Sequence, residues 1–309
     1  MVNSPTGSVT ATPISLISDG PLIAPSSSAA WPAPSGIVVV SEGTAGLFLV
    51  DLGSGRVAKL TDVPFAAFDG DWAPDGSRLV FRAEPEGNSE IFAIDADGDN
   101  IRNLTNSPAA DFAPAWSPDG KLIAFASDRS PSNGASDIFV MAPDGTEVRR
   151  VTGHAGVDEY PDWSPDSNQI VFSGGAAAGA NQDIYVVDSD GTNARNLTNT
   201  AGNENQPAWS PDGRTIAFNC AEGTCAGGAS LEQAADLFSV GATGTNYRVL
   251  ADTPADERDA AWSLDGRLIT YLRYPGGRYV MNADGSNQRP MPIPLTEPGF
   301  VEWRPPRGG

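Results

Sequence analysis

The chain has 309 residues, a formal net charge of −20 and a pI near 4.2. Such an acidic protein repels polyanions, which excludes nucleic acid as a partner and argues against an anionic membrane surface. No run of about 18 apolar residues occurs in the sequence, so we expect no membrane-spanning segment.

Residues 1–30 differ in composition from the rest, being rich in Ser, Thr, Ala and Pro with Asp19 as the only charged residue. Residues 8–12 and 14–17 have β-propensity, which predicts an extended arm that could add to a sheet edge. The arm could pack on its own domain or pair with another molecule. The start shows no signal-peptide pattern, so export would require that a leader was removed or replaced by an initiating methionine.

From residue 31 onward the chain is a repeat array marked by tryptophan. The residues are Trp31, Trp72, Trp116, Trp163, Trp209, Trp262 and Trp303, spaced by 41, 44, 47, 46, 53 and 41 positions. These spacings lie in the range of propeller blades.

A tight turn and two strands follow most of these tryptophans. The turns are Pro74–Gly76, Pro118–Gly120, Pro165–Ser167, Pro211–Gly213 and Leu264–Gly266. Each turn precedes a short apolar strand such as residues 122–125, and a second strand reads acid-aliphatic-aromatic, as in residues 137–140. We expect the acid that begins this second strand to make a repeated hydrogen bond rather than a repeated active site.

A second turn such as Asp144–Gly145 and a third strand such as residues 148–152 complete the unit, and the residues before the next tryptophan supply a fourth strand. Four antiparallel strands repeated six times predict an all-β, six-bladed β-propeller.

Seven tryptophans for six blades leave one terminal segment in excess. We expect residues 299–304 to form the inner strand that closes blade one beside residues 37–40, because closure removes exposed sheet edges. The predicted organisation is therefore an arm over residues 1–30, a propeller over 31–304 and a tail over 305–309. Blade six carries three prolines in residues 289–294, which predicts a weak outer edge open to docking.

The tandem Trp-Ser-Pro-Asp-Gly, Asp-Ile-Tyr-Val and Arg-Asn-Leu-Thr elements resemble the repeats of the TolB-like propeller family over about residues 31–304. This resemblance implies a propeller that serves as a docking platform for proteins at the cell envelope. The family hosts several functions, so the resemblance is specific for fold and weakly specific for function.

Cys220 and Cys225 are the only cysteines. We expect a disulfide that closes a small surface loop, which implies an oxidising compartment and a secreted, cell-surface or periplasmic protein. Free thiols are the alternative. A zinc cluster would need more ligands than these two and the single histidine supply.

Acidic residues precede the tryptophans and form the candidate binding site. They are Asp69, Asp111, Asp158, Glu159, Glu204 and Glu257. Because inner strands converge on the channel of a propeller, we expect these carboxylates to ring one mouth of it. The ring could be solvated, could receive Arg and Lys side chains of a partner, or could hold Ca²⁺ through oxygen ligands.

We expect no cofactor and no catalytic activity. His154 is the only imidazole, and no Gly-x-Ser-x-Gly motif accompanies it, which argues against a histidine-dependent nucleophilic triad. The function predicted is an extracytoplasmic protein-interaction or self-assembly module, which could form filaments through exchange of the arm or the terminal strand. The alternatives are a carbohydrate-active lyase or hydrolase that uses the acidic mouth, and a propeller that binds a cation or small ligand.

Overall fold

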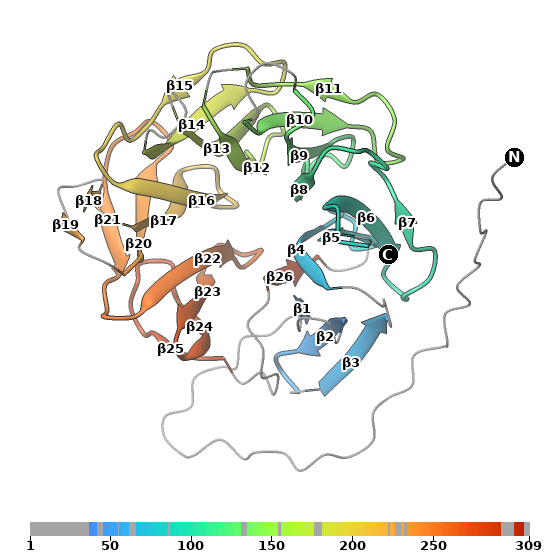
Figure 1. The fold of residues 1–309 in the computed structure, drawn as a ribbon. Helices are drawn as coiled ribbons and strands as arrows, with labels where there is room; N and C mark the ends of the chain where they lie inside the picture. The colour runs from blue at the N-terminus through green and yellow to red at the C-terminus, as the bar shows by residue number, and fades with distance from the viewer. Residues whose placement is uncertain are drawn as a thin grey trace, which may run out of the picture.

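The structure is a computed structural model, and it describes most of the chain from residue 37 onward. The described residues are 37–41, 46–54, 56–61, 66–85, 87–130, 135–153, 156–175, 181–221, 223–225, 230–231, 234–291 and 300–305. Their regular elements are all strands, which form six four-stranded antiparallel sheets around a central axis (Figure 1). The predicted six-bladed β-propeller is confirmed.

Each blade runs from an inner strand at the central axis to an outer strand at the rim. Blade one holds, in this order, β26 (Val301–Arg304), β1 (Ile37–Ser41), β2 (Leu47–Asp51) and β3 (Arg56–Thr61), and blade two holds β4 (Ala67–Trp72), β5 (Arg78–Ala83), β6 (Glu90–Asp95) and β7 (Arg102–Asn103). Blade three holds β8 (Asp111–Trp116), β9 (Ile123–Ser127), β10 (Asp137–Met141) and β11 (Arg149–Arg150), and blade four holds β12 (Asp158–Trp163), β13 (Gln169–Gly175), β14 (Gln182–Asp188) and β15 (Arg195–Asn196). Blade five holds β16 (Asn203–Trp209), β17 (Thr215–Ala221), β20 (Asp236–Gly241) and β21 (Arg248–Ala251), and blade six holds β22 (Asp256–Trp262), β23 (Leu268–Tyr274), β24 (Gly277–Asn282) and β25 (Arg289–Pro290). A small hairpin of β18 (Gly223–Thr224) and β19 (Ser230–Leu231) branches from blade five.

The turn after each inner strand is fixed by its own side chains, as blade three shows. The Ser117 hydroxyl donates to Asp119 at 2.8 Å and accepts the Leu122 N–H at 2.9 Å, while Gly120 takes a φ of +73°. Only glycine adopts this conformation without steric cost. The Ser-Pro-Asp-Gly sequence therefore sets the register of the first hairpin.

Stacked aromatic pairs lie between the two middle strands of blades two to five. Phe125 of β9 lies opposite Phe139 of β10, with ring centroids 5.9 Å apart. The equivalent pairs are Phe81 with Phe92, Phe172 with Tyr185 and Phe218 with Phe238. Such cross-strand pairs stabilise a sheet and fix its register, which explains why the aromatic positions recur in the sequence.

Strand β26 closes the ring as predicted, because it pairs antiparallel with β1 and sets Val38 opposite Trp303. Arg304 extends the closure into blade two, where it donates to the Gly76 carbonyl at 3.1 Å and lies over the Trp72 ring. The arm of residues 1–30 lies outside the described residues, and so does Trp31.

The outer edge of blade six does not differ in strand length from those of blades two to four. Strand β25 has two residues, like β7, β11 and β15, and Met291 continues the pairing by donating to the Arg278 carbonyl at 2.8 Å. In its described part this edge pairs like those of blades two to four, while Pro292 and Pro294 lie outside the described residues, so the docking role predicted for blade six stays a prediction. No helix in the described ranges is long and apolar enough to cross a membrane.

Candidate functional site

A channel of about 430 Å³ runs between the six inner strands. Three positions of each strand line it, the residues one, two and three places before the tryptophan. Every polar side chain among these residues lies either one place or three places before the tryptophan. The former are Asp71, Ala115, Asp162, Ala208, Ala261 and Glu302, and the latter are Asp69, Ala113, Tyr160, Gln206, Asp259 and Phe300.

A β-bulge turns the second of these positions into the channel in five blades. The register of the inner strand shifts just before the tryptophan in each of them. The residue at the bulge has a positive φ, between 31° and 54° for Asp69, Ala113, Tyr160, Gln206 and Asp259. Left-handed backbone costs roughly 1–2 kcal/mol for a residue with a side chain, and such strain gathers at functional sites.

The bulge residues bring carboxylates, an amide and a phenol together. Asp69 lies 3.6 Å from the Arg82 guanidinium, and Gln206 donates a short hydrogen bond to Asp259. Burial raises the pKa of Asp259 to about 6 and also raises that of Asp69. Burial, with nearby carboxylates, raises the pKa of Tyr160 to about 12. The phenol therefore stays neutral, and the layer is polar and weakly acidic.

Phe300 adds an aromatic face to this layer, and Gly70 makes room for it. A Cβ placed on Gly70 would lie 2.6 Å from the Phe300 ring and 2.9 Å from the Val80 carbonyl. Real Cβ contacts are not this short, so blade two needs glycine where blades three to five have proline (Pro114, Pro161 and Pro207).

Three carboxylates lie deeper in the channel, one place before the tryptophans. Asp71 accepts the Trp116 N–H at 2.6 Å, and Asp162 accepts the Trp209 N–H at 2.7 Å, so each binds the inner strand of the next blade. Burial raises the pKa of Asp71 to about 7 and that of Asp162 to about 6. Burial and the charge of Asp71 raise the pKa of Glu302 well above its usual value. Asp71 and Asp162 thus link neighbouring blades inside the channel, whereas Glu302 accepts the N–H of the adjacent Trp303 at 3.0 Å.

Of the six predicted binding residues, the structure places Asp69 in the channel lining and the other five elsewhere. Asp111, Asp158, Glu204 and Glu257 are fully buried between neighbouring blades. This placement differs from the expected ring at the mouth. The physical reason is the bulge, which breaks the alternation of side chains between the two faces of the strand. The residue five places before the tryptophan therefore points into the boundary between two neighbouring blades, which we call the seam.

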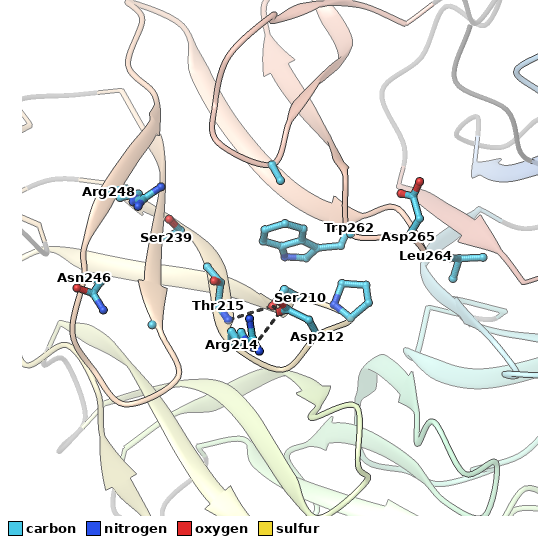
Figure 2. A pocket seen from close by; sticks show the side chains of 14 residues that line it. Ser210, Asp212, Arg214, Thr215, Ser239, Asn246, Arg248, Trp262, Leu264 and Asp265 are labelled. Atoms are coloured by element: carbon cyan, nitrogen blue, oxygen red, sulfur yellow. Dashed lines mark hydrogen bonds between the residues drawn. The ribbon is translucent and has the colours of Figure 1, made fainter. Parts of the chain in front are cut away.

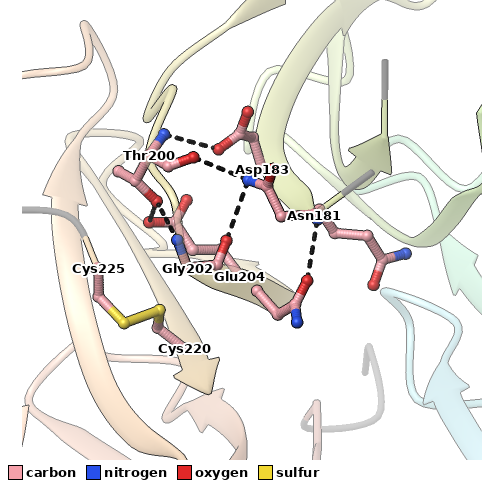
Figure 3. The surroundings of a disulfide bond; sticks show 9 residues. Asn181, Asp183, Thr200, Gly202, Glu204, Cys220 and Cys225 are labelled. Atoms are coloured by element: carbon pink, nitrogen blue, oxygen red, sulfur yellow. Dashed lines mark hydrogen bonds between the residues drawn. A yellow bond between two sulfur atoms is a disulfide. The ribbon is translucent and has the colours of Figure 1, made fainter. Parts of the chain in front are cut away.

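In the seam these acids hold the loop that leads into the inner strand. Thr200 shows the arrangement, because its N–H donates to Asp183 at 2.9 Å and its hydroxyl donates to Glu204 at 2.9 Å (Figure 3). Thr253 donates to Glu257 in the same way. Asp183 is the acid that begins the acid-aliphatic-aromatic strand of blade four, and it thus makes the hydrogen bond predicted for this repeated position.

Arginine neutralises two of the buried acids. The Nη2 group of Arg129 donates to both carboxylate oxygens of Asp111 at 2.7 and 2.8 Å, and Arg273 lies 2.8 Å from Glu257. Glu159, the remaining predicted residue, is half-buried and accepts a hydrogen bond from Ser136 at 3.0 Å, and burial raises its pKa. Within the described ranges, no three His, Cys, Asp or Glu residues are placed to hold a metal ion.

Sequence reasoning missed most of the channel lining, although one signal pointed to it. Proline stands two places before the tryptophan in blades three, four and five. Proline has no N–H to donate and within sheets is confined to edges or bulges. A proline inside an inner strand therefore marks a bulge, and with it a change of the face that the preceding residues occupy.

The predicted disulfide links Cys220 and Cys225, whose Cα atoms are 6.1 Å apart. Both cysteines are buried in the cluster that contains Phe218 and Trp209, and the exposed residues Gly223 and Thr224 lie between them, so the disulfide closes a small exposed loop. Figure 3 places it beside the seam that holds Glu204. His154 lies outside the described residues.

Comparisons with known proteins agree with this architecture. The sequence profile of the family described as TolB β-propeller domain matches residues 15–173, more than half of the chain. A search of the curated proteins finds no match.

Among solved structures, the chain is similar to TolB from Acinetobacter baumannii, with a TM-score of 0.73, 20% identity and coverage of 87% of this chain and 67% of that one. It is similar to a chain of the nidogen/laminin complex, with a TM-score of 0.68, 14% identity and coverage of 87% and 98%. It is also similar to an oligogalacturonate lyase in complex with manganese, with a TM-score of 0.55, 14% identity and coverage of 91% and 84%. At these identities the similarity shows the fold alone.

Proposed function

The chain belongs to the TolB β-propeller domain family, and from this premise we propose that it is a non-catalytic, extracytoplasmic protein-interaction module whose partner docks at the channel. The observation that carries the proposal is the repeated bulge. In five blades, one residue of the inner strand has a strained, left-handed backbone conformation, and this conformation turns its side chain toward the channel.

The chemistry of the channel favours a short basic or polar segment of a protein. Asp69 and Asp259 supply negative charge, Gln206 and Tyr160 supply hydrogen-bonding groups, and Phe300 supplies an aromatic surface. A net charge of −20 attracts such a segment over a distance. The volume of about 430 Å³ suits a few side chains rather than a folded domain.

Comparative affinity capture tests the proposal. The immobilised protein, an Asp69→Asn/Asp259→Asn variant and an Asp99→Asn/Asp144→Asn control are exposed to extracts of the cell envelope. The control removes the same charge from exposed hairpin turns. We expect a protein that binds the wild type and the control and is reduced at least tenfold on the channel variant. Equal recovery on all three would contradict docking at the channel.

An extracytoplasmic location is supported by the disulfide, because such bonds persist in oxidising compartments.

We further propose that the protein self-assembles through the arm of residues 1–30. The arm is favoured over the terminal strand for this exchange, because β26 already pairs with β1 of its own blade. Size-exclusion chromatography of the full chain and of a variant lacking residues 1–30 tests it. Identical monomer profiles at high concentration would contradict it.

The raised pKa of Asp259, with Asp69 nearby, favours a carbohydrate-active enzyme as the second candidate. A carboxyl group with a pKa near 6 can act as a general acid near neutral pH. Turnover of an acidic polysaccharide that is lost in Asp259→Asn but kept in Asp99→Asn would support the enzyme and contradict the non-catalytic proposal.

A further inference from the structure

Trp262 departs from the pattern set by the other inner-strand tryptophans. Trp72, Trp116, Trp163, Trp209 and Trp303 are 3–7% exposed. Trp262 is only partly buried, and its ring borders a pocket of about 800 Å³ between blades five and six (Figure 2). Its indole N–H donates to the Ala208 carbonyl at 3.1 Å, so one edge of the ring is fixed.

The pocket exists because blade five carries small residues on the face that covers the next tryptophan. Thr215 stands where blades two, three, four and six have the larger residues Arg78, Leu122, Gln169 and Leu268. Ser239 stands where these blades have Ala93, Val140, Val186 and Val280, and Gly241 stands where they have Asp95, Ala142, Asp188 and Asn282. All three residues line the pocket. Ser239 is smaller than the valines of blades three, four and six but not smaller than Ala93 of blade two, so blade five is distinguished by having small residues at all three positions together.

The guanidinium of Arg248 lacks the hydrogen bond that its counterparts make across the boundary to the next blade, and it interacts electrostatically with Asp284 of that blade. At the equivalent position, Arg149 donates to the Ser189 carbonyl at 2.9 Å, and Arg195 donates to the Ala242 carbonyl at 3.0 Å. Both bonds cross to the next blade. Arg248 makes no hydrogen bond or ion pair through its guanidinium to the described residues, although Ala283 of the next blade lines the same pocket.

The polar groups at the pocket carry both signs of charge. Arg214 and Arg248 supply donors, Asp212 and Asp265 supply acceptors, and Asn246 supplies both. Arg248 has Asp284 as its charged neighbour, Arg214 has Asp212, and Asp265 has Arg267, so the formal charges around the pocket cancel and favour neither an anion nor a cation. Hydroxyl groups both donate and accept, so a ligand rich in them matches this set.

We propose that the pocket between blades five and six binds a neutral saccharide, with a sugar ring packed on the face of Trp262 and its hydroxyl groups bonded to Arg248 and the other polar residues. The C–H groups of a sugar face carry partial positive charge, and the face of an indole ring carries negative charge. This site differs in chemistry from the channel and does not depend on the proposed protein docking there.

Tryptophan fluorescence of the full chain tests the proposal, because packing of a sugar changes the surroundings of the partly exposed Trp262. The probes are cellotetraose, maltotetraose and chitotetraose, with citrate as the anionic and choline as the cationic comparison. We expect at least one tetrasaccharide to shift the emission saturably, with no saturable response to citrate or choline.

Two variants fill the pocket with residues that other blades carry there, Ser239→Val and Thr215→Leu. Both are expected to keep the fold and to weaken saccharide binding at least tenfold. Arg248→Ala is expected to weaken binding about tenfold, while Arg195→Ala, at the same place in blade four, leaves it unchanged.

The proposal is overturned if no tetrasaccharide shifts the emission, or if citrate or choline alone does so. It is also overturned if binding survives in folded Ser239→Val and Thr215→Leu proteins, which would place the sugar elsewhere.

Discussion

Individual carboxylates have one of two roles in this propeller, and the residues around each carboxylate determine which role it has. Asp111 and Glu257 are buried against arginine in the seams between blades. Asp69 and Asp259 face the channel with weaker neutralisation. A buried ion pair that loses one partner leaves an uncompensated charge, which is costly.

We therefore expect Arg129→Ala to reduce the free energy of unfolding by about 3 kcal/mol, because Asp111 would stay buried without its partner. Arg258→Ala is the matched control, since Arg258 pairs with Asp256 near the surface and should contribute less than about 1 kcal/mol. Urea unfolding measures both. Similar losses in the two variants would contradict the structural role given to Asp111.

The channel carboxylates predict the dependence of stability on pH. The pKa of Asp71 rises from 3.8 to about 7 on folding, and that of Asp162 to about 6. The folded state therefore binds more protons than the unfolded state between about pH 4 and pH 7, and stability falls as pH rises through this window. We expect a higher Tm at pH 5 than at pH 8.

Asp71→Asn separates this effect from other titrations. The amide keeps an oxygen that can accept the Trp116 N–H but has no charge to bury, so the fall in Tm between pH 5 and pH 8 should shrink. Asp144→Asn should leave it unchanged, because hydrogen bonds to Thr146 lower the pKa of that exposed carboxyl. An unaltered fall in Asp71→Asn would show that other groups cause it.

At the scale of one element, the bulge in the inner strand turns toward the channel the side chains that form the candidate site. Ala113 lies at the bulge of β8 with a φ of +50°, whereas Ala115, two residues on, is outside the left-handed region. Both side chains are buried, so the loss of either methyl group costs a similar amount.

We expect Ala113→Gly to leave stability unchanged or raise it by up to about 1 kcal/mol, because glycine relieves the left-handed strain. Ala115→Gly should lower stability by about 1 kcal/mol through the lost methyl group and the more flexible unfolded chain. Chemical unfolding of the two variants compares them directly. A larger loss in Ala113→Gly would mean that the bulge carries no strain.

The bulge also explains which parts of the structure could be predicted from the sequence. Blade number, strand order and the closure by residues 299–304 follow from features that repeat with the tryptophans. The placement of Asp111 and Glu204 could not be predicted in this way, because a strict alternation of side chains between the two faces of a strand ignores the extra residue at the bulge. Proline at positions 114, 161 and 207 was the available signal. The pocket beside Trp262 arises where blade five departs from the repeat, and its shape depends on the packing of two blades.

At the scale of the whole molecule, the ring depends on one short strand from the other end of the chain. Strand β26 supplies the inner edge of blade one and buries Trp303. Without it, β1 would expose an unpaired edge, and such edges promote association.

Removal of residues 300–309 should therefore give a protein that unfolds at a much lower temperature and elutes as oligomers or aggregates. Removal of residues 306–309 alone keeps β26 and should leave the wild-type profile. Thermal unfolding and size-exclusion chromatography check both. A monomeric, equally stable product of the longer deletion would show that closure is not needed for folding.

The central claim is that the channel receives a segment of a protein partner, and site-specific photo-cross-linking in cells that make the protein tests it most directly. A photoreactive amino acid replaces Tyr160 inside the channel or Asp99 on an exposed hairpin turn. The account predicts one discrete adduct with another protein from position 160 and none of that size from position 99. No adduct from position 160, or the same adduct from both positions, would contradict it.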